Sequence, residues 1–381
     1  MKAFSLTDSQ IARIVGAAAA DELSRRFNRH VDFLTTASWT GETVLGRGGV
    51  ALDEVEKNAC ARRAASLFGL DEAYLLSRPA ETIADWAASL AGALKESQTS
   101  FCFKPAARSG EDIAYPHGAD EIYQDAAAAA NILYGRRRLL SFVAPHSLLG
   151  FELSIATPNL LDIESVDARR MTPETLSKSL LFGDVLVATP TLWRYMMQEK
   201  VKAPDNTLAV SFGEPMTPAL AVEMRKSGFG VLRELYGSTE TGLIAWRDTP
   251  GEAFVLFDHW RKDDDNLMRR MPDGTLKPVE AMDSLSWSGE REFLLQGRRD
   301  GAVQIGAVNV FPDAVAAALL DANELPDEPD FTCERLPGFL KNAELPIIQS
   351  SLPLLEYPHD VLRYHVANMK ENLAGRIHRG S

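Results

Sequence analysis

Residues 230–242 read Gly-Val-Leu-Arg-Glu-Leu-Tyr-Gly-Ser-Thr-Glu-Thr-Gly. The apolar run at the start of this stretch predicts a buried strand, and the small and hydroxylated residues after Tyr236 predict a loop at its carboxyl end. Backbone N–H groups and hydroxyls in such a loop can bind phosphate, and the carboxylate of Glu240 can hold a divalent cation. An ordinary polar turn after a buried strand is the alternative interpretation.

Upstream of this strand, short apolar runs alternate with helical segments. Helices are expected to begin at Thr-Pro pairs, because Thr is a favoured N-cap and Pro fits the first helical turn. The expected strands are 100–103, 139–143, 184–188 and 208–211, and the expected helices are 121–133 and those beginning at 172, 189 and 217. This alternation predicts βαβ units and a mostly parallel sheet, whose ligands bind at the carboxyl ends of strands.

The flanking regions differ in character. Residues 8–94 are expected to be largely helical, whereas residues 248–275 are rich in Asp and Gly and are expected to be antiparallel or irregular. The composition shifts again after Gly297. We therefore expect an α/β fold with a large domain at 1–296, in which mixed sheets are flanked by helices and residues 1–94 form a helical part. A hinge and a shortened C-terminal subdomain are expected at 297–381.

Two further motifs accompany the loop. The turn Ser211-Phe212-Gly213-Glu214-Pro215 follows a predicted strand and precedes a predicted helix. The segment 297–312, Gly-Arg-Arg-Asp-Gly-Ala-Val-Gln-Ile-Gly-Ala-Val-Asn-Val-Phe-Pro, follows Asp283, which lies 15 residues before Arg298. A Gly-Glu-Pro turn is common, and the second segment is also compatible with a simple β-hairpin joined by an Arg-Asp-Gly turn.

The three motifs together resemble the signature of the adenylate-forming superfamily, which includes acyl- and aryl-CoA ligases, peptide-synthetase adenylation domains and luciferases. The resemblance covers about residues 95–312 and, weakly, 8–94. It implies ATP and Mg²⁺ as cofactors and the activation of a carboxylic acid as its acyl-adenylate.

The resemblance also implies roles for individual residues. Tyr236 would pack on adenine, Thr239 would contact the α-phosphate and Glu240 would bind Mg²⁺. His146 would lie beside the acyl pocket, which makes Thr239, Glu240 and His146 the expected catalytic set; a structural histidine is the open alternative. Asp283 and Arg298 would bind the ribose, with Glu290 as a weaker candidate. The rest of the nucleotide site would comprise Gly213, Glu214, Pro215, Gly237 and Ser238.

The sequence departs from the superfamily's pattern in two places. When the phosphate loop is aligned on His117, it falls on residues 105–113, and Ile113 stands where the superfamily has Lys. In this alignment Arg108, Ser109 and Gly110 are expected to contact the nucleotide; either Arg108 replaces the Lys, or ATP is held more weakly. Near the C-terminus, Arg376 stands where a substrate-contacting Lys is expected; either Arg376 acts there as a cation, or the segment is an ordinary basic terminus. The thioester-forming step is therefore in doubt.

Composition excludes some function classes. The net charge of −13, without a dense basic block, excludes a nucleic-acid surface. The three isolated cysteines, Cys60, Cys102 and Cys333, are typical of a reducing compartment. We expect a cytoplasmic protein with no membrane span or signal segment.

The aromatic residues Trp193, Phe212 and Trp246 are candidate pocket residues and suggest a flat aromatic acid. The short tail resembles that of an atypical adenylating protein of griseoluteate (phenazine) antibiotic biosynthesis. That resemblance implies a phenazine carboxylate and a downstream reductase or other acceptor enzyme. A compact 4-coumarate-type aryl-CoA ligase is the second hypothesis. A non-catalytic binder of nucleotide or aryl acid, or a pathway scaffold, is the third.

Overall fold

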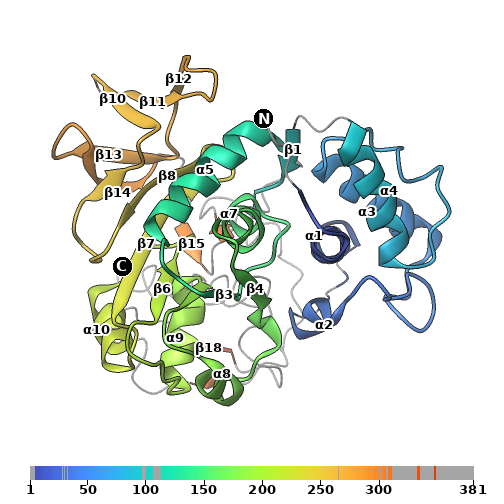
Figure 1. Cartoon of the computed structure of the whole chain (residues 1–381), viewed down its shortest axis with the longest axis horizontal. Coiled ribbons are helices and arrows are strands. Elements are labelled where there is room, and N and C mark those ends of the chain that lie inside the picture. Colours follow the sequence, from blue (N-terminus) through green and yellow to red (C-terminus); the bar gives the residue numbers. More distant parts are fainter. Residues whose placement is uncertain are drawn as a thin grey trace, which may run out of the picture.

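The computed structural model describes residues 5–27, 29, 31, 33–96, 100–105, 113–264, 266–299, 301, 303–305, 308–310, 333–334 and 347–348. The helices, shown in Figure 1, are α1 (Asp8–Phe27), α2 (Phe33–Ser38), α3 (Glu54–Leu67), α4 (Ile83–Glu96), α5 (Ala119–Ile132), α6 (Leu148–Phe151), α7 (Thr157–Leu161), α8 (Pro173–Ser179), α9 (Pro190–Gln198) and α10 (Pro218–Lys226). None of the helices in the described part of the chain has the length and the apolar run needed to cross a bilayer.

The strands of the main sheet are β3 (Arg138–Ser141), β4 (Glu164–Asp167), β5 (Asp184–Ala188), β6 (Leu208–Ser211), β7 (Val231–Ser238), β8 (Gly242–Arg247), β9 (Phe254–Leu256), β13 (Asp283–Trp287) and β14 (Glu292–Arg298). The smaller sheets contain β1 (Ser100–Phe103), β2 (Tyr115–Gly118), β10 (Trp260–Asp263), β11 (Asn266–Arg270), β12 (Leu276–Val279), β15 (Val303–Ile305), β16 (Val308–Val310), β17 (Cys333–Glu334) and β18 (Ile347–Ile348).

The main sheet has nine strands in the order β13-β14-β9-β8-β7-β6-β5-β3-β4. The strands from β4 to β7 pair in parallel, and those from β7 to β13 pair antiparallel. The parallel sheet predicted upstream of Tyr236 is confirmed, and so are the antiparallel strands expected within residues 248–275; together they give the predicted mixed sheet. The direction changes because β7 and β8 are joined by a short hairpin turn, whereas parallel strands need a longer crossover.

The central parallel strands β5 and β6 are buried on both faces, which explains why they read as continuous apolar runs. On one face, Val185 and Val187 pack with α5 and with the region around Leu153. On the other face, Leu186 packs with α8, α9 and α10. The predicted Thr-Pro starts of these three helices are confirmed, because Thr172, Thr189 and Thr217 each accept an N–H from the third helical residue.

The predicted helical region at 8–94 is confirmed. Helices α1, α3 and α4 gather at one side of the molecule, in blue in Figure 1, and share one apolar cluster with β1. Asp53 caps α3 in a capping box with Glu56, which satisfies two of the free backbone donors at the start of that helix.

A π-helical turn at Glu152–Ala156 joins α6 to α7. Pro158 follows it and has no N–H, so the carbonyl of Ser154 loses the bond that residue i+4 of an α-helix would give. That carbonyl instead accepts a hydrogen bond from Ser165 Oγ at 2.6 Å. Glu152, the first residue of this turn, is buried in the interior beneath α5.

The antiparallel half of the main sheet is strongly curled. In sheet order β14 is three strands from β7, which is roughly 14 Å in a flat sheet. The rings of Tyr236 on β7 and Phe293 on β14 are nevertheless 5.6 Å apart. The curl therefore brings the outer strands over Tyr236, and the separate sheet β10–β12 lies beyond them in Figure 1.

Strand β14 runs across the predicted domain boundary at 296/297 and ends at Arg298. After it, β15 and β16 form an antiparallel hairpin. The division of the chain into a large domain and a shortened C-terminal subdomain stays a prediction.

Candidate functional site

The predicted phosphate-binding loop after Tyr236 is the turn of the β7–β8 hairpin. Gly237 pairs with Leu243 and Ser238 with Gly242, so residues 239–241 form the turn itself. The backbone N–H of Ser238 donates to Thr241 Oγ1 at 3.2 Å, which closes the turn from inside. A Cβ on Gly237 would lie 2.3 Å from the carbonyl oxygen of Gly242. Only glycine therefore allows the two strands to approach this closely.

Three residues predicted to bind the adenosine part of ATP meet beside this hairpin. Tyr236 donates its hydroxyl to Asp283 Oδ2 at 2.9 Å. Asp283, at the start of β13, pairs in register with Arg298, at the end of β14. Burial, followed by the negative charge of Asp283, raises the pKa of Tyr236 well above its ordinary value, so this hydroxyl remains a donor. Glu290 is exposed in the turn between β13 and β14, outside this group.

The predicted adenine turn at 213–215 is held by the carboxylate of its central residue. Glu214 is buried; its Oε1 accepts the backbone N–H of Thr191, and its Oε2 accepts a hydrogen bond from Arg194, both at 3.1 Å. The turn is thereby tied to the start of α9. Gly213 is half-buried and Pro215 is exposed on either side of Glu214.

A second carboxylate ties the end of the same turn to β7. Glu234 Oε1 accepts the backbone N–H of Met216 at 3.1 Å, and Oε2 accepts from Arg247 Nε at 2.8 Å. Burial raises the pKa of Glu234, and the Arg247 guanidinium partly opposes that rise. The adenine turn and the hairpin loop are therefore fixed to one strand.

The loop's carbonyls face the protein. His117 on β2 lies with Nε2 2.6 Å from the carbonyl oxygen of Thr239. His117 was considered from the sequence only as the residue on which the phosphate loop is aligned. Its contact with the hairpin was not predicted. Burial lowers the pKa of His117, which favours the neutral ring.

Glu240 and Thr239 are half-buried at the tip of the hairpin, and within the described residues no side-chain partner engages the Glu240 carboxylate. Among those same residues, no three His, Cys, Asp or Glu side chains gather to hold a metal ion. A lone carboxylate fits Mg²⁺ delivered with a nucleotide, since Mg²⁺ commonly takes one or two carboxylates plus phosphate oxygens.

His146 lies apart from this group, in the turn between β3 and α6. Its Nε2 is 3.7 Å from Asp21 Oδ1 on α1. Burial lowers the pKa of His146 to about 4; Asp21 opposes that shift, and Arg63 and Arg25 add to it. His146 is therefore a neutral ring packed against the helical region at neutral pH.

One predicted pocket residue lies in the core, and several predicted contact residues fall outside the part of the chain that the structure describes. Trp193 is fully buried, donates Nε1–H to the carbonyl of Val210 at 3.3 Å and packs edge-on against Phe229. The expectation that it lines a substrate pocket is wrong, because it fills the core beneath α9. Arg108, Ser109, Gly110 and Arg376 lie outside the described residues.

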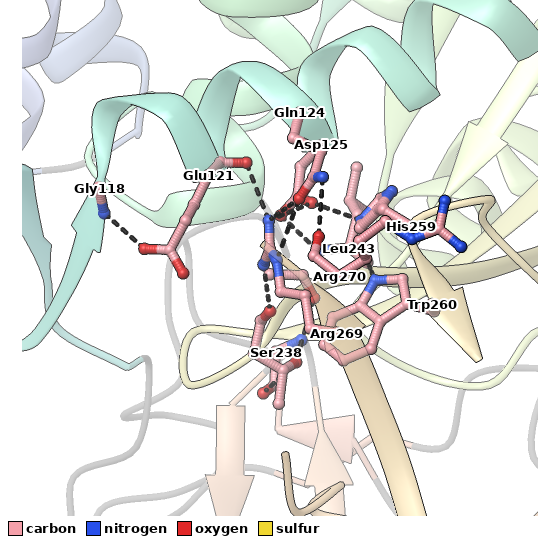
Figure 2. Close-up of polar contacts among 12 residues, drawn as sticks. Gly118, Glu121, Gln124, Asp125, Ser238, Leu243, His259, Trp260, Arg269 and Arg270 are labelled. Atoms are coloured by element: carbon pink, nitrogen blue, oxygen red, sulfur yellow. Dashed lines mark hydrogen bonds and ion pairs between the residues drawn. The ribbon is translucent and has the colours of Figure 1, made fainter. Parts of the chain in front are cut away.

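Sequence reasoning missed a buried polar group behind the hairpin, formed by Asp125, Glu152, His259 and Arg269. Figure 2 shows Asp125, His259 and Arg269 of this group. A signal for it exists. Asp125 lies on the apolar stripe of α5 formed by Ile122, Ala126 and Ala129. A carboxylate at that spacing must be buried, and a buried carboxylate needs partners.

Comparison with known proteins supports the resemblance to ligases. No family model matches the chain. A 4-coumarate–CoA ligase of Halorhodospira halophila is 26% identical over 317 residues, which cover 82% of this chain and 80% of that protein. The 4-coumarate–CoA ligase of Rhodobacter capsulatus is 27% identical over 290 residues, covering 73% of this chain and 74% of that one. The chain is similar to adenylate-forming ligases.

The similarity supports the predicted enzyme class, a carboxylate-adenylating ligase. Among solved structures, ATP-bound MatB from Rhodopseudomonas palustris has a TM-score of 0.47 at 14% identity, and the match covers 86% of this chain and 80% of that one.

Proposed function

We propose that this protein activates an aromatic carboxylic acid as its acyl-adenylate, with ATP as co-substrate and Mg²⁺ as the metal. The observation that carries the proposal is the meeting of Tyr236, Asp283 and Arg298 beside the β7–β8 hairpin. These residues come from three strands and were each selected for an adenosine-binding role from sequence alone. In the proposed site, Asp283 accepts ribose hydroxyls while the Tyr236 hydroxyl holds its carboxylate in place.

In the proposed reaction, a carboxylate oxygen of the acid attacks the α-phosphorus of ATP. The new bond joins the acyl oxygen to that phosphorus, and the bond to the bridging oxygen breaks, so that pyrophosphate leaves with the electron pair. Thr239 donates a hydrogen bond to the α-phosphate and Glu240 holds the metal. Mg²⁺, when bound, neutralises charge on the phosphates. The protein thus contributes position and charge complementarity rather than a covalent intermediate.

Two acceptors are proposed for the adenylate. The names of the relatives favour CoA, which would make the protein an aryl-CoA ligase of the 4-coumarate type. Arg376, which stands where the superfamily has a substrate-contacting Lys, favours transfer of the adenylate to a partner reductase or other acceptor enzyme, with a phenazine carboxylate as the acid.

The test is ATP–pyrophosphate exchange with a panel of cinnamates, benzoates and phenazine carboxylates. Glu240→Gln is expected to lower the exchange by at least about 100-fold. Glu223→Gln, which removes an exposed carboxylate from α10, is the matched control and is expected to leave the exchange unchanged. The absence of exchange with every acid, together with no heat on titration with ATP and Mg²⁺, would refute the proposal.

Addition of CoA then separates the two acceptors. Mass-spectrometric detection of a CoA thioester supports the aryl-CoA ligase. Accumulation of enzyme-bound adenylate without thioester supports transfer to a partner enzyme.

A further inference from the structure

The feature that the proposed function leaves unexplained is the buried ion pair between Asp125 on α5 and Arg269 on β11. Asp125 is 1% exposed and Arg269 is 3% exposed. Arg269 Nη2 donates to Asp125 Oδ1 at 2.8 Å and to the carbonyl of Glu121 at 2.9 Å. Taking two charges out of water is costly, and a pair of this kind is weak evidence for stability by itself.

The pair holds the hairpin turn on both sides of Gly242; Figure 2 shows Asp125, Arg269 and Leu243. Arg269 Nη1 donates to the carbonyl of Thr241 at 3.0 Å, on the side before Gly242. Asp125 Oδ2 accepts the backbone N–H of Leu243 at 3.1 Å, on the side after it. One guanidinium and one carboxylate therefore fix the two peptide groups where the turn rejoins β8.

The fit around Gly242 is close. A Cβ at this position would lie 2.1 Å from Asp125 Oδ2, and the backbone has φ +75°, which favours glycine. The carboxylate thus occupies the space that a side chain on the loop would need. Two further groups face Asp125: His259, with Nε2 2.9 Å from Oδ1, and the carboxyl of Glu152.

We propose that Asp125 and Arg269 are positioning residues for the nucleotide loop, which set the placement of Thr239 and Glu240 through the peptide groups at Thr241 and Leu243. This inference rests on the proposed function. Within the described part of the chain the side chains of Thr239 and Glu240 have no partners that would hold them, so their placement follows the backbone of the turn. Arg269 and Asp125 lie behind that backbone and do not touch the substrate.

The chain offers a matched control for this pair. Asp184, also 1% exposed, accepts from Arg138 Nη2 at 2.6 Å and from the backbone N–H of Leu181 at 2.8 Å. It begins β5, at the amino-terminal end of the parallel strands, whereas the hairpin turn follows the carboxyl end of β7. Asp125→Asn and Asp184→Asn therefore remove the same charge from similar surroundings, and only the first touches the loop.

The first measurement is steady-state kinetics of adenylation. Asp125→Asn is expected to lower kcat by about 10- to 100-fold, because a small displacement of groups that bind the reacting phosphate strongly affects the barrier. It should also raise the Mg²⁺ concentration that gives half-maximal rate. Asp184→Asn should leave both quantities within about twofold of wild type after correction for folded protein. Equal effects of the two variants would overturn the inference.

The second measurement needs no substrate. In the ligand-free protein, the backbone amides of residues 239–243 are expected to exchange with deuterium about tenfold faster in Asp125→Asn than in wild type, and unchanged in Asp184→Asn. Unchanged exchange at these amides would overturn the inference. A wild-type protein without adenylation activity would refute the proposed function. The deuterium-exchange measurement would still decide whether Asp125 and Arg269 fix the turn.

If Asp125→Asn does not fold, Arg269→Lys carries the same test. Lysine keeps the positive charge but cannot donate to Thr241, Glu121 and Asp125 together. Faster exchange of the loop amides with a lowered kcat supports the positioning role, and wild-type values for both contradict it.

Discussion

Replacement of Glu152 by Gln is expected to stabilise the protein, and increasingly so as the pH rises. Glu152 is 0% exposed, and neither carboxyl oxygen has a well-formed hydrogen bond from the described residues. Burial, followed by the nearby negative charge of Asp125, raises the pKa of Glu152 well above its ordinary value of 4.5. The side chain is therefore a neutral acid in the folded protein at pH values where it is ionised in the unfolded chain.

The size of the effect follows from proton linkage. Above pH 4.5 the folded state keeps one proton that the unfolded state has released. The free energy of unfolding therefore falls by about 1.4 kcal/mol for each pH unit, until the pH reaches the raised pKa of the folded protein. Gln has nearly the shape of the neutral acid and never ionises, so Glu152→Gln removes this slope.

The assay is urea unfolding of wild type and Glu152→Gln at one-unit steps from pH 5 to pH 8. The quantity to follow is the difference in free energy of unfolding between the two proteins. In both of them His146 contributes a free energy of unfolding that rises with pH, and this contribution cancels in the difference. The lowered pKa of His146, about 4, gives stability that is present above its ordinary value of 6.5 and lost as the pH falls toward 4.

Glu174→Gln is the control for net charge, since the Glu174 side chain is 78% exposed on α8. The reasoning fails if Glu152→Gln is less stable than wild type by the same amount at every pH, because Glu152 would then be an ionised and satisfied carboxylate.

Two other predictions concern the hairpin. Tyr236→Phe removes the hydroxyl that donates a hydrogen bond to Asp283, so the KM for ATP should rise by about 3- to 10-fold, with a smaller change in kcat. Initial-rate kinetics check this prediction, and an unchanged KM contradicts it. Gly237→Ala should cost about 1–3 kcal/mol, because its Cβ meets the carbonyl of Gly242. Gly92→Ala, in helix α4 with open space around the new Cβ, should instead stabilise by about 0.5–1 kcal/mol in the same thermal unfolding assay.

Local features of the fold were predictable from sequence because they depend on neighbouring residues. The Thr-Pro helix starts and the apolar strand at 184–188 are examples, and the structure agrees closely with both. The order in which the antiparallel strands after β8 complete the main sheet was not predictable, because it depends on which distant strands pair. The pairing of β9 with β14 links residues about forty positions apart.

The candidate site also contains residues that could be predicted from the sequence and residues that could not. Tyr236, Asp283 and Arg298 were selected through resemblance, and the structure brings them together. His146 was selected on a weaker motif, and it packs against α1 away from that group. Asp125 was overlooked because its neighbours are alanines, and its partner Arg269 lies 144 positions away on another element.

The curl of the sheet has a mechanical consequence for the Tyr236–Asp283 contact. Four successive strand pairings separate β7 from β13, and each contributes its own twist to the path between the two side chains. A slight unwinding at every pairing adds up along that path, so the gap at its end widens by much more than any single junction moves. The hydrogen bond between Tyr236 and Asp283 closes this path, so its length responds to the summed twist of all the strand pairings in the antiparallel half.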